Sequence, residues 1–180
     1  MEEAVFYKSD GPVIYARATG HVTALICPSL KEAIFERLES APAVEHVYLD
    51  LSSCEYMDST FLGLIVGTQK RFAKLPADKA GARMIVLIGV NEACQGLLRT
   101  IGVLGMVELT DGPVPFPADL PRLSGEARSS ARFLLDSHEE LSQLSAENRS
   151  RFAALTSLLK KAVDSEAEAP QAGRRAKGKD

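Results

Sequence analysis

The stretch that decides the fold is Val47-Tyr-Leu-Asp-Leu-Ser-Ser-Cys-Glu-Tyr-Met-Asp-Ser-Thr-Phe-Leu-Gly-Leu-Ile-Val-Gly67. In its first part Val47, Leu49 and Leu51 alternate with other residues, which is the period of a strand with one buried face. From Asp58 onward a stripe of residues recurs at intervals of three and four, which is the period of a helix. The stripe consists of Phe61, Leu64, Ile65, Thr68, Phe72 and Leu75. The stretch therefore predicts a strand, a short loop and a helix that begins near Asp58 and Ser59.

The hydroxyl of Ser59 at this helix start has three interpretations. The first is a plain helix cap, because the oxygens of Asp, Ser and Thr accept the unpaired amide hydrogens of a first helical turn. The second is a covalent switch, because a phosphate there would add about −1.5 to −2 charge beside the positive end of the helix dipole. The third is a hydrolase nucleophile. The third is disfavoured, because Met57 and Phe61 stand where a Gly-x-Ser-x-Gly elbow has its glycines.

The run from Met57 to Gly63, after a Leu-Asp-Leu strand, resembles the STAS domain of bacterial anti-sigma factor antagonists. In that family, a serine in an Asp-Ser-(Ser/Thr)-Gly-Leu-Gly stretch is phosphorylated by a partner kinase. Asp58 matches the acidic residue and Ser59 the phospho-acceptor, whereas Phe61 stands where the usual pattern has glycine. The resemblance covers about residues 4–110.

This resemblance implies a bacterial, cytoplasmic regulator of transcription that works by partner switching and is not an enzyme. The unphosphorylated form is expected to bind a serine kinase that acts as an anti-sigma factor. Phosphorylation of Ser59 would break that complex, and a serine phosphatase would reset it. Thr60 is the runner-up phosphate acceptor, and neither a catalytic residue, a metal nor a cofactor is expected. The residues expected to contact the partner are Asp58, Ser59, Thr60, Phe61, Leu62 and Gly63.

The composition is that of an ordinary globular protein, with 180 residues, 46% hydrophobic, 25% charged and a net charge of −3. That charge gives no reason to expect direct binding of nucleic acid, and no apolar run is long enough to cross a membrane. The N-terminus lacks the basic and apolar regions of a signal peptide. Three widely spaced cysteines, Cys27, Cys54 and Cys94, form no metal pattern and indicate reduced thiols in a cytoplasmic protein.

Around the central stretch the sequence predicts an α/β fold, a STAS-like mixed sheet covered by helices. Further strands are expected at 4–9, 13–18, 82–89 and 106–109, and further helices at 28–40 and 91–102. Strands that alternate with helices need crossover connections, so this part of the sheet should be parallel behind an N-terminal hairpin. Gly63 and Gly67 lie one turn apart in the motif helix, where glycine costs about 1 kcal/mol relative to alanine. We interpret them as positions where the helix approaches the sheet closely.

The sequence divides into a STAS domain at 1–111, a proline-rich linker at 112–122, a helical extension at 123–165 and a disordered tail at 166–180. Truncation near Leu120 is expected to leave a folded domain. The extension is predicted as one helix or two, with His138, Ser145 and Asn148 at inward heptad positions. Because these three are polar, a strong self-contained coiled coil is not expected.

Three arrangements remain for the extension: packing back on the domain, a weak coiled coil, or folding on a partner. Self-association or partner docking through it would suit a second function. In that function the STAS domain is a scaffold that assembles a larger signalling complex, and Ser59 is only a helix cap. An enzyme is a third hypothesis and would need a clustered Ser, His and acid. His21, His46 and His138 show no such arrangement in the sequence, and His138 is interpreted as solvated or interfacial.

Overall fold

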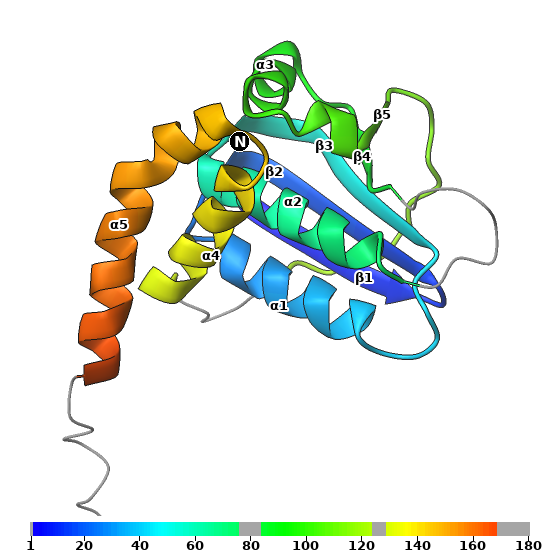
Figure 1. The fold of residues 1–180 in the computed structure, drawn as a ribbon. Coiled ribbons are helices and arrows are strands. Elements are labelled where there is room, and N and C mark those ends of the chain that lie inside the picture. Colours follow the sequence, from blue (N-terminus) through cyan, green and yellow to red (C-terminus); the bar gives the residue numbers. More distant parts are fainter. Residues whose placement is uncertain (1, 76–83, 124–128, 169–180) are drawn as a thin grey trace, which may run out of the picture.

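The computed structural model describes residues 2–75, 84–123 and 129–168 (Figure 1). One mixed sheet has the strand order β1-β2-β3-β4-β5, with β1 and β2 antiparallel and every later pair parallel. Its strands are β1 Ala4–Asp10, β2 Val13–Val22, β3 His46–Met57, β4 Val86–Ile88 and β5 Glu108–Thr110. The helices are α1 Cys27–Leu38, α2 Ser59–Phe72, α3 Glu92–Ile101, the 3-10 turn η1 Leu104–Met106, α4 Ala131–Ser142 and α5 Ala146–Glu168. The predicted mixed sheet covered by helices, followed by a helical extension, is confirmed.

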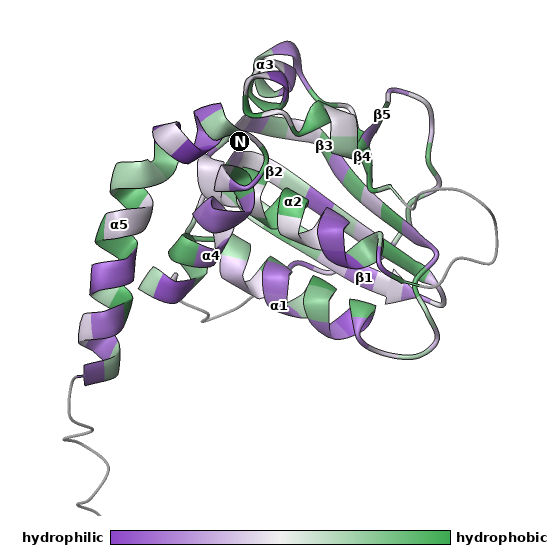
Figure 2. Ribbon diagram, viewed as in Figure 1, coloured by the Kyte–Doolittle hydropathy of each residue, from purple (hydrophilic) through white to green (hydrophobic). Residues whose placement is uncertain are grey.

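The core lies between the central strands and helices α1 and α2, which lie side by side in front of the sheet (Figure 1). Hydrophobic and hydrophilic residues alternate along the strands (Figure 2), as expected for a sheet with two different faces. Helix α2 is buried along nearly its whole length, because the sheet lies on one side of it and α4 on another. The buried hydrophobic residues of β2 and β3 include Ile14, Ala16, Ala18, Val47, Leu49 and Leu51.

The proline-rich segment runs along the first strand and across the far face of the sheet. Tyr7 N donates to Pro121 O at 3.0 Å, and Leu123 N donates to Val5 O at 2.8 Å. The Phe116 ring contacts Tyr15, with 5.3 Å between ring centroids. The two backbone bonds cover the edge strand β1, whose backbone groups would otherwise be open to pairing with another chain.

The second half of the sheet differs from the sequence-based expectation. In place of a continuous strand at 82–89, the described part contains only the three-residue β4, in which Leu87 is buried and its neighbours are half-buried. Ile85, just before β4, bonds both to a helix and to a strand: its N donates to Gln69 Oε1 of α2 at 2.8 Å, and its O accepts from Glu108 N of β5 at 2.9 Å. The last strand is β5, and η1 takes part of the range 106–109. The predicted loop at 76–81 and the start of the predicted strand lie outside the described residues.

Helix α3 follows the prediction from sequence closely. Asn91 Oδ1 accepts a hydrogen bond from Cys94 N at 2.9 Å, and the helix ends at Gly102 with a φ of 84°. Glycine suits that left-handed position because it has no Cβ. All three cysteines are buried and free. Burial raises the pKa of the Cys54 thiol to about 12 and raises the pKa of Cys27 as well, so these thiols stay protonated and unreactive at neutral pH.

The helical extension forms a hairpin of two helices, which we call the α4–α5 hairpin (residues 131–168). Of the three arrangements that the sequence left open, α4 packs back on the domain, against α2, while α5 packs on α4. The heptad pattern assumed one continuous helix, and it missed Phe133 and Leu135, which are buried. Helix α5 also continues to Glu168, three residues into the predicted tail, and residues 169–180 lie outside the description.

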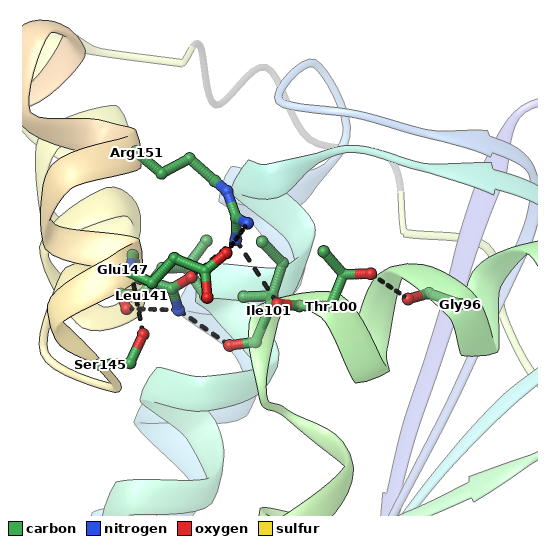
Figure 3. Close-up of polar contacts among 8 residues, drawn as sticks. Gly96, Thr100, Ile101, Leu141, Ser145, Glu147 and Arg151 are labelled. Atoms are coloured by element: carbon green, nitrogen blue, oxygen red, sulfur yellow. Dashed lines mark hydrogen bonds and ion pairs between the residues drawn. The ribbon is translucent and has the colours of Figure 1, made fainter.

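Polar residues join the turn of this hairpin to the end of α3 (Figure 3). Ser145 Oγ accepts from Asn148 N at 3.0 Å and so caps α5. The buried Asn148 amide donates to Ile101 O at 2.8 Å and to Leu141 O at 3.1 Å. Arg151 extends from α5 to Thr100 O. The polar residues that weaken a coiled coil are therefore hydrogen-bonded within this fold.

Among the described residues, no helix combines the length and the apolar character that crossing a bilayer requires.

Candidate functional site at the start of α2

The start of α2 is held by Asp58. Its backbone is extended, with a φ of −94° and a ψ of 174°, and its Oδ1 accepts from Phe61 N at 3.0 Å. Oδ2 of the same carboxylate accepts from Ala24 N at 3.0 Å, so Asp58 also fixes the loop between β2 and α1. Asp58 is therefore the N-cap and Ser59 is the first helical residue. The interpretation of Ser59 as the cap of this helix is wrong.

The Ser59 hydroxyl instead meets a side chain that is 79 positions away in the sequence. Ser59 Oγ lies 2.8 Å from Nε2 of His138 on α4, and Nδ1 of that ring lies 2.7 Å from Leu134 O. A carbonyl oxygen can only accept, so Nδ1 carries the hydrogen, and in the neutral ring Nε2 is an acceptor. Ser59 therefore donates its hydroxyl hydrogen to His138.

His138 lies at the junction of three helices. Its side chain is 3% exposed, and its ring meets the Phe152 ring of α5 edge-on at 5.4 Å between centroids. Of the solvated and interfacial positions that the sequence left open for His138, the structure shows the interfacial one. Among the described residues, three or more side chains of the metal-ligating types do not gather anywhere at metal-binding distance.

The backbones of α2 and α4 are in direct contact at Gly63. A Cβ atom placed there would lie 2.2 Å from Ser137 O, and one at Gly67 would lie 3.7 Å from side-chain atoms of Glu140 and Phe35. The expectation that these glycines let the helix approach the sheet is wrong. Gly63 is needed because α4 crosses α2 at that position, and any side chain would separate the two helices.

Charged pairs surround the contact between α2, α1 and α4. Lys70 forms an ion pair with Glu140 and donates to Gln143 Oε1 at 2.8 Å. Lys31 of α1 lies 3.5 Å from Asp136 of α4. These pairs are partly exposed, so they contribute mainly to the orientation of α4 and little to stability.

The predicted contact residues do not form one exposed surface. Asp58 and Ser59 are half-buried, whereas Thr60, Phe61 and Leu62 are 3%, 0% and 2% exposed. The Phe61 ring lies in the hydrophobic core, so its replacement of the usual glycine does not add a bulky group to the outer surface. His138 and Ser137 were not identified as site residues from the sequence. Their one sequence signal was a histidine at an inward heptad position.

The Ser59–His138 pair lacks features that a hydrolase needs. The group that orients His138 is a backbone carbonyl and not an acid. Every described non-glycine residue has a negative φ, so Ser59 is not on the strained turn that exposes a hydrolase nucleophile. Two cavities of about 300 and 590 Å³ lie along α4, and neither is lined by Ser59 or His138. The geometry therefore gives no support to the nucleophile interpretation.

A family model described as the MlaB STAS domain matches residues 9–109, which is more than half of the chain. The chain belongs to the STAS domain family. The STAS match ends before the proline-rich segment, so the α4–α5 hairpin that carries His138 lies outside the matched residues.

The solved structure of the anti-sigma factor antagonist SpoIIAA in its unphosphorylated form is similar to this STAS protein. The identity is 16% and the TM-score is 0.41, and the match covers 60% of this chain and 87% of that one. A comparison with curated proteins found no match.

Proposed function

We propose that this STAS protein is an anti-sigma factor antagonist-like regulator, a non-catalytic partner-binding module that phosphorylation of Ser59 switches. The observation that carries the proposal is the division of roles at the start of α2. Asp58 caps the helix, so the Ser59 hydroxyl is not required for the helix to form. The one hydrogen bond described for this hydroxyl is with another element, across the interface with α4.

The position is chemically suited to a phosphate. Ser59 is the first residue of α2, where unpaired amide hydrogens and the helix dipole favour negative charge. The neighbouring Asp58 carboxylate repels that charge, and a phosphate within a protein interface also loses its hydration. The helix can therefore survive the modification while a contact made by its first turn is lost.

The family resemblance supplies the proposed partners. In the bacterial cytoplasm, the unphosphorylated protein would bind a serine kinase that acts as an anti-sigma factor, and so would alter transcription indirectly. A serine phosphatase would remove the phosphate. Asp58, Ser59 and the helix start that follows them would form the contact with the kinase.

The test is a comparison of partner affinity among four proteins: wild type, Ser59→Ala, Ser59→Glu and Thr60→Val. The partner is first identified by affinity capture from the native cytoplasm with wild type, and its binding to each purified protein is then measured by calorimetry. Ser59→Ala should bind at least as tightly as wild type and resist phosphorylation. Ser59→Glu should bind more weakly, although incompletely so, because a carboxylate has less charge and fewer acceptors than a phosphate. Thr60→Val is the matched control, since Thr60 is buried. Equal affinity of wild type and Ser59→Glu would contradict the proposal.

One observation favours a second function, a scaffold that assembles a complex through its C-terminal helix. Leu155 and Leu158 on α5 are 38% and 65% exposed, and hydrophobic and hydrophilic residues are interspersed along this helix (Figure 2). Light scattering of wild type and Leu158→Lys tests it. A larger assembly that the substitution dissolves would support the scaffold, and identical monomers would speak against self-association.

A further inference from the structure

We infer that the α4–α5 hairpin is an intramolecular cover, which must leave α2 before Ser59 can be modified or its surroundings bound by another protein. That the hairpin covers α2 is inferred from contacts within this chain. That the cover keeps a kinase or another partner away from Ser59 rests on the proposed function.

Ser59 is half-buried, and on its α4 side the space is filled. The hydroxyl lies 2.8 Å from His138 Nε2, and the histidine ring is held by Leu134 O and by the Phe152 ring. A phosphoryl group on Oγ would need the volume that this ring fills. It would also replace the hydrogen that Ser59 donates to Nε2, leaving a buried ring nitrogen without that bond. With the hydroxyl oriented toward His138 as it is here, phosphorylation of Ser59 and docking of α4 therefore exclude each other.

The backbones of α2 and α4 also touch one turn further along α2. Since Ser137 O would lie 2.2 Å from a Cβ at Gly63, the two backbones leave no room there even for a methyl group. Another protein cannot insert a side chain between them. The face of α2 that contains Ser59 and Gly63 is thus occupied by this chain's own α4.

The hairpin has an apolar docking face of its own and a second polar attachment to the domain, besides the Ser59–His138 bond. Leu141 is fully buried, and Phe133 and Phe152 are 7% and 8% exposed within the hydrophobic core. The buried Asn148 amide bonds to Ile101 O at the end of α3. Docking consequently involves apolar burial in addition to the Ser59–His138 bond, and the covered state should dominate the population.

These contacts imply a reciprocal coupling. If docking hinders modification of Ser59, then modification must hinder docking by the same factor in equilibrium terms. A phosphate would also bring negative charge toward α4, where Asp136 and Glu140 are already paired with Lys31 and Lys70. Modification at Ser59 would thereby keep α2 uncovered, and release of the hairpin would precede any partner contact there.

The test measures access to position 59 directly and needs no kinase. In full-length Ser59→Cys protein, the rate at which iodoacetamide alkylates the introduced thiol is followed by peptide mass spectrometry. The native cysteines are 0–3% exposed and serve as internal references. The rate is compared with that in a second protein that also carries Leu141→Ala, which weakens α4 docking without removing a polar contact to position 59. The matched control carries Leu158→Ala, because Leu158 is on α5 but exposed.

We expect the introduced thiol to react at least about ten-fold more slowly than an unstructured peptide of the same sequence, because reaction requires local opening. Leu141→Ala should accelerate the reaction by a similar factor of about ten or more, while Leu158→Ala leaves it unchanged. A rate at position 59 equal to that of the peptide would overturn the cover. The cover would also be overturned if Leu141→Ala accelerated alkylation of Cys27, Cys54 and Cys94 as much as that of position 59, since this would mean that the whole domain opens.

A second measurement keeps Ser59 native. Hydrogen exchange of wild type and His138→Ala should show faster exchange in α4 and unchanged exchange in β3. Unchanged exchange in α4 would overturn the role of the Ser59–His138 bond in docking. Failure of the proposed function would give a different result. Partner affinity would then be the same with and without substitution of Ser59, while the alkylation and hydrogen-exchange results would still be as predicted.

Discussion

At the residue scale, Asp58 and Ser59 are adjacent but have different roles. The Asp58 carboxylate accepts from two backbone amides, Phe61 N in α2 and Ala24 N in the loop after β2. The one hydrogen bond described for the Ser59 side chain is to His138 of α4. A substitution at either position should therefore produce a different kind of defect.

Asp58→Ala should lower the free energy of unfolding by about 1–2 kcal/mol, because a cap is lost and a second amide loses its acceptor. Urea denaturation followed by circular dichroism measures the change. Asp58→Asn is the control, since its side-chain oxygen can still cap the helix and the loss should be smaller. An Asp58→Ala protein as stable as wild type would show that the cap is not needed.

Ser59 and His138 should be energetically coupled. A double-mutant cycle with Ser59→Ala and His138→Ala should give a coupling energy of about 0.5–1.5 kcal/mol, the usual contribution of a hydrogen bond. Each single substitution leaves the other partner without its bond, so the double substitution should cost less than the sum of the two. Strict additivity in the unfolding free energies would contradict the contact.

The buried carboxylate of Asp50 predicts a pH dependence of stability. Burial alone would raise its pKa, but hydrogen bonds from Ser52 and Arg17 outweigh burial and lower the pKa. A carboxyl group with a lowered pKa in the folded state stabilises the fold above its unfolded pKa of about 3.9, and this stability is lost as the pH falls through the folded pKa.

Asp50→Asn should therefore be less stable than wild type at pH 7, and the difference should shrink as the pH falls below about 3.9. Urea titrations at a series of pH values from neutral downward provide the measurement. A stability difference that stays constant over the whole series would show that ionised Asp50 contributes nothing specific.

At the element scale, the packing of α4 on α2 depends on Gly63. Gly63→Ala places a Cβ where Ser137 O now lies, so α4 must shift or detach. We expect a loss of unfolding free energy of about 1–3 kcal/mol, the usual cost of overpacking, together with faster hydrogen exchange in α4.

Gly96→Ala on α3 is the matched control. No atom outside the α3 backbone lies within 4 Å of that Cβ, and alanine there should stabilise the helix by up to about 1 kcal/mol. Equal effects of the two substitutions would contradict the close contact.

The elements with a clear period were predictable, and their partners were not. Strand β3 and helix α2 follow from the change of period near Asp58, and α3 from Asn91 and Gly102. The inward position of His138 was visible as a polar residue in an apolar stripe. Its contact with Ser59 was not, because periodicity tells which face of a helix is buried and not against which element. For the same reason Gly63 was assigned to the sheet instead of α4.

The sequence alone also could not show which residue caps α2 and which one begins the helix. Asp, Ser and Thr all cap helices, and three of them stand together at residues 58–60. Only the extended backbone of Asp58 and its bond to Phe61 N distinguish the cap from the first helical residue.

At the scale of the whole molecule, the STAS domain should fold without its hairpin. The proposed boundary near residue 120 is refined by two bonds to β1, from Tyr7 N to Pro121 O and from Leu123 N to Val5 O. Truncation after Leu123 should therefore give a cooperative thermal transition at a lower temperature, since the sheet and α1 to α3 retain a common core. Truncation after Asp111 should be less stable again, because it also removes Phe116 from Tyr15. A gradual, non-cooperative transition after the first truncation would mean that the hairpin is part of the domain.

Whether Ser59 is a phosphorylation switch is decided by the position of the phosphate in the whole protein. The chain is isolated from its native cells with phosphatases inhibited, and its phosphopeptides are sequenced by mass spectrometry with Ser59→Ala protein alongside. We expect phosphate on Ser59 in wild type and none at residues 58–63 in Ser59→Ala. Phosphate on Thr60 alone would contradict the switch. So would a Ser59 that stays unmodified when the protein is bound to its kinase and supplied with ATP.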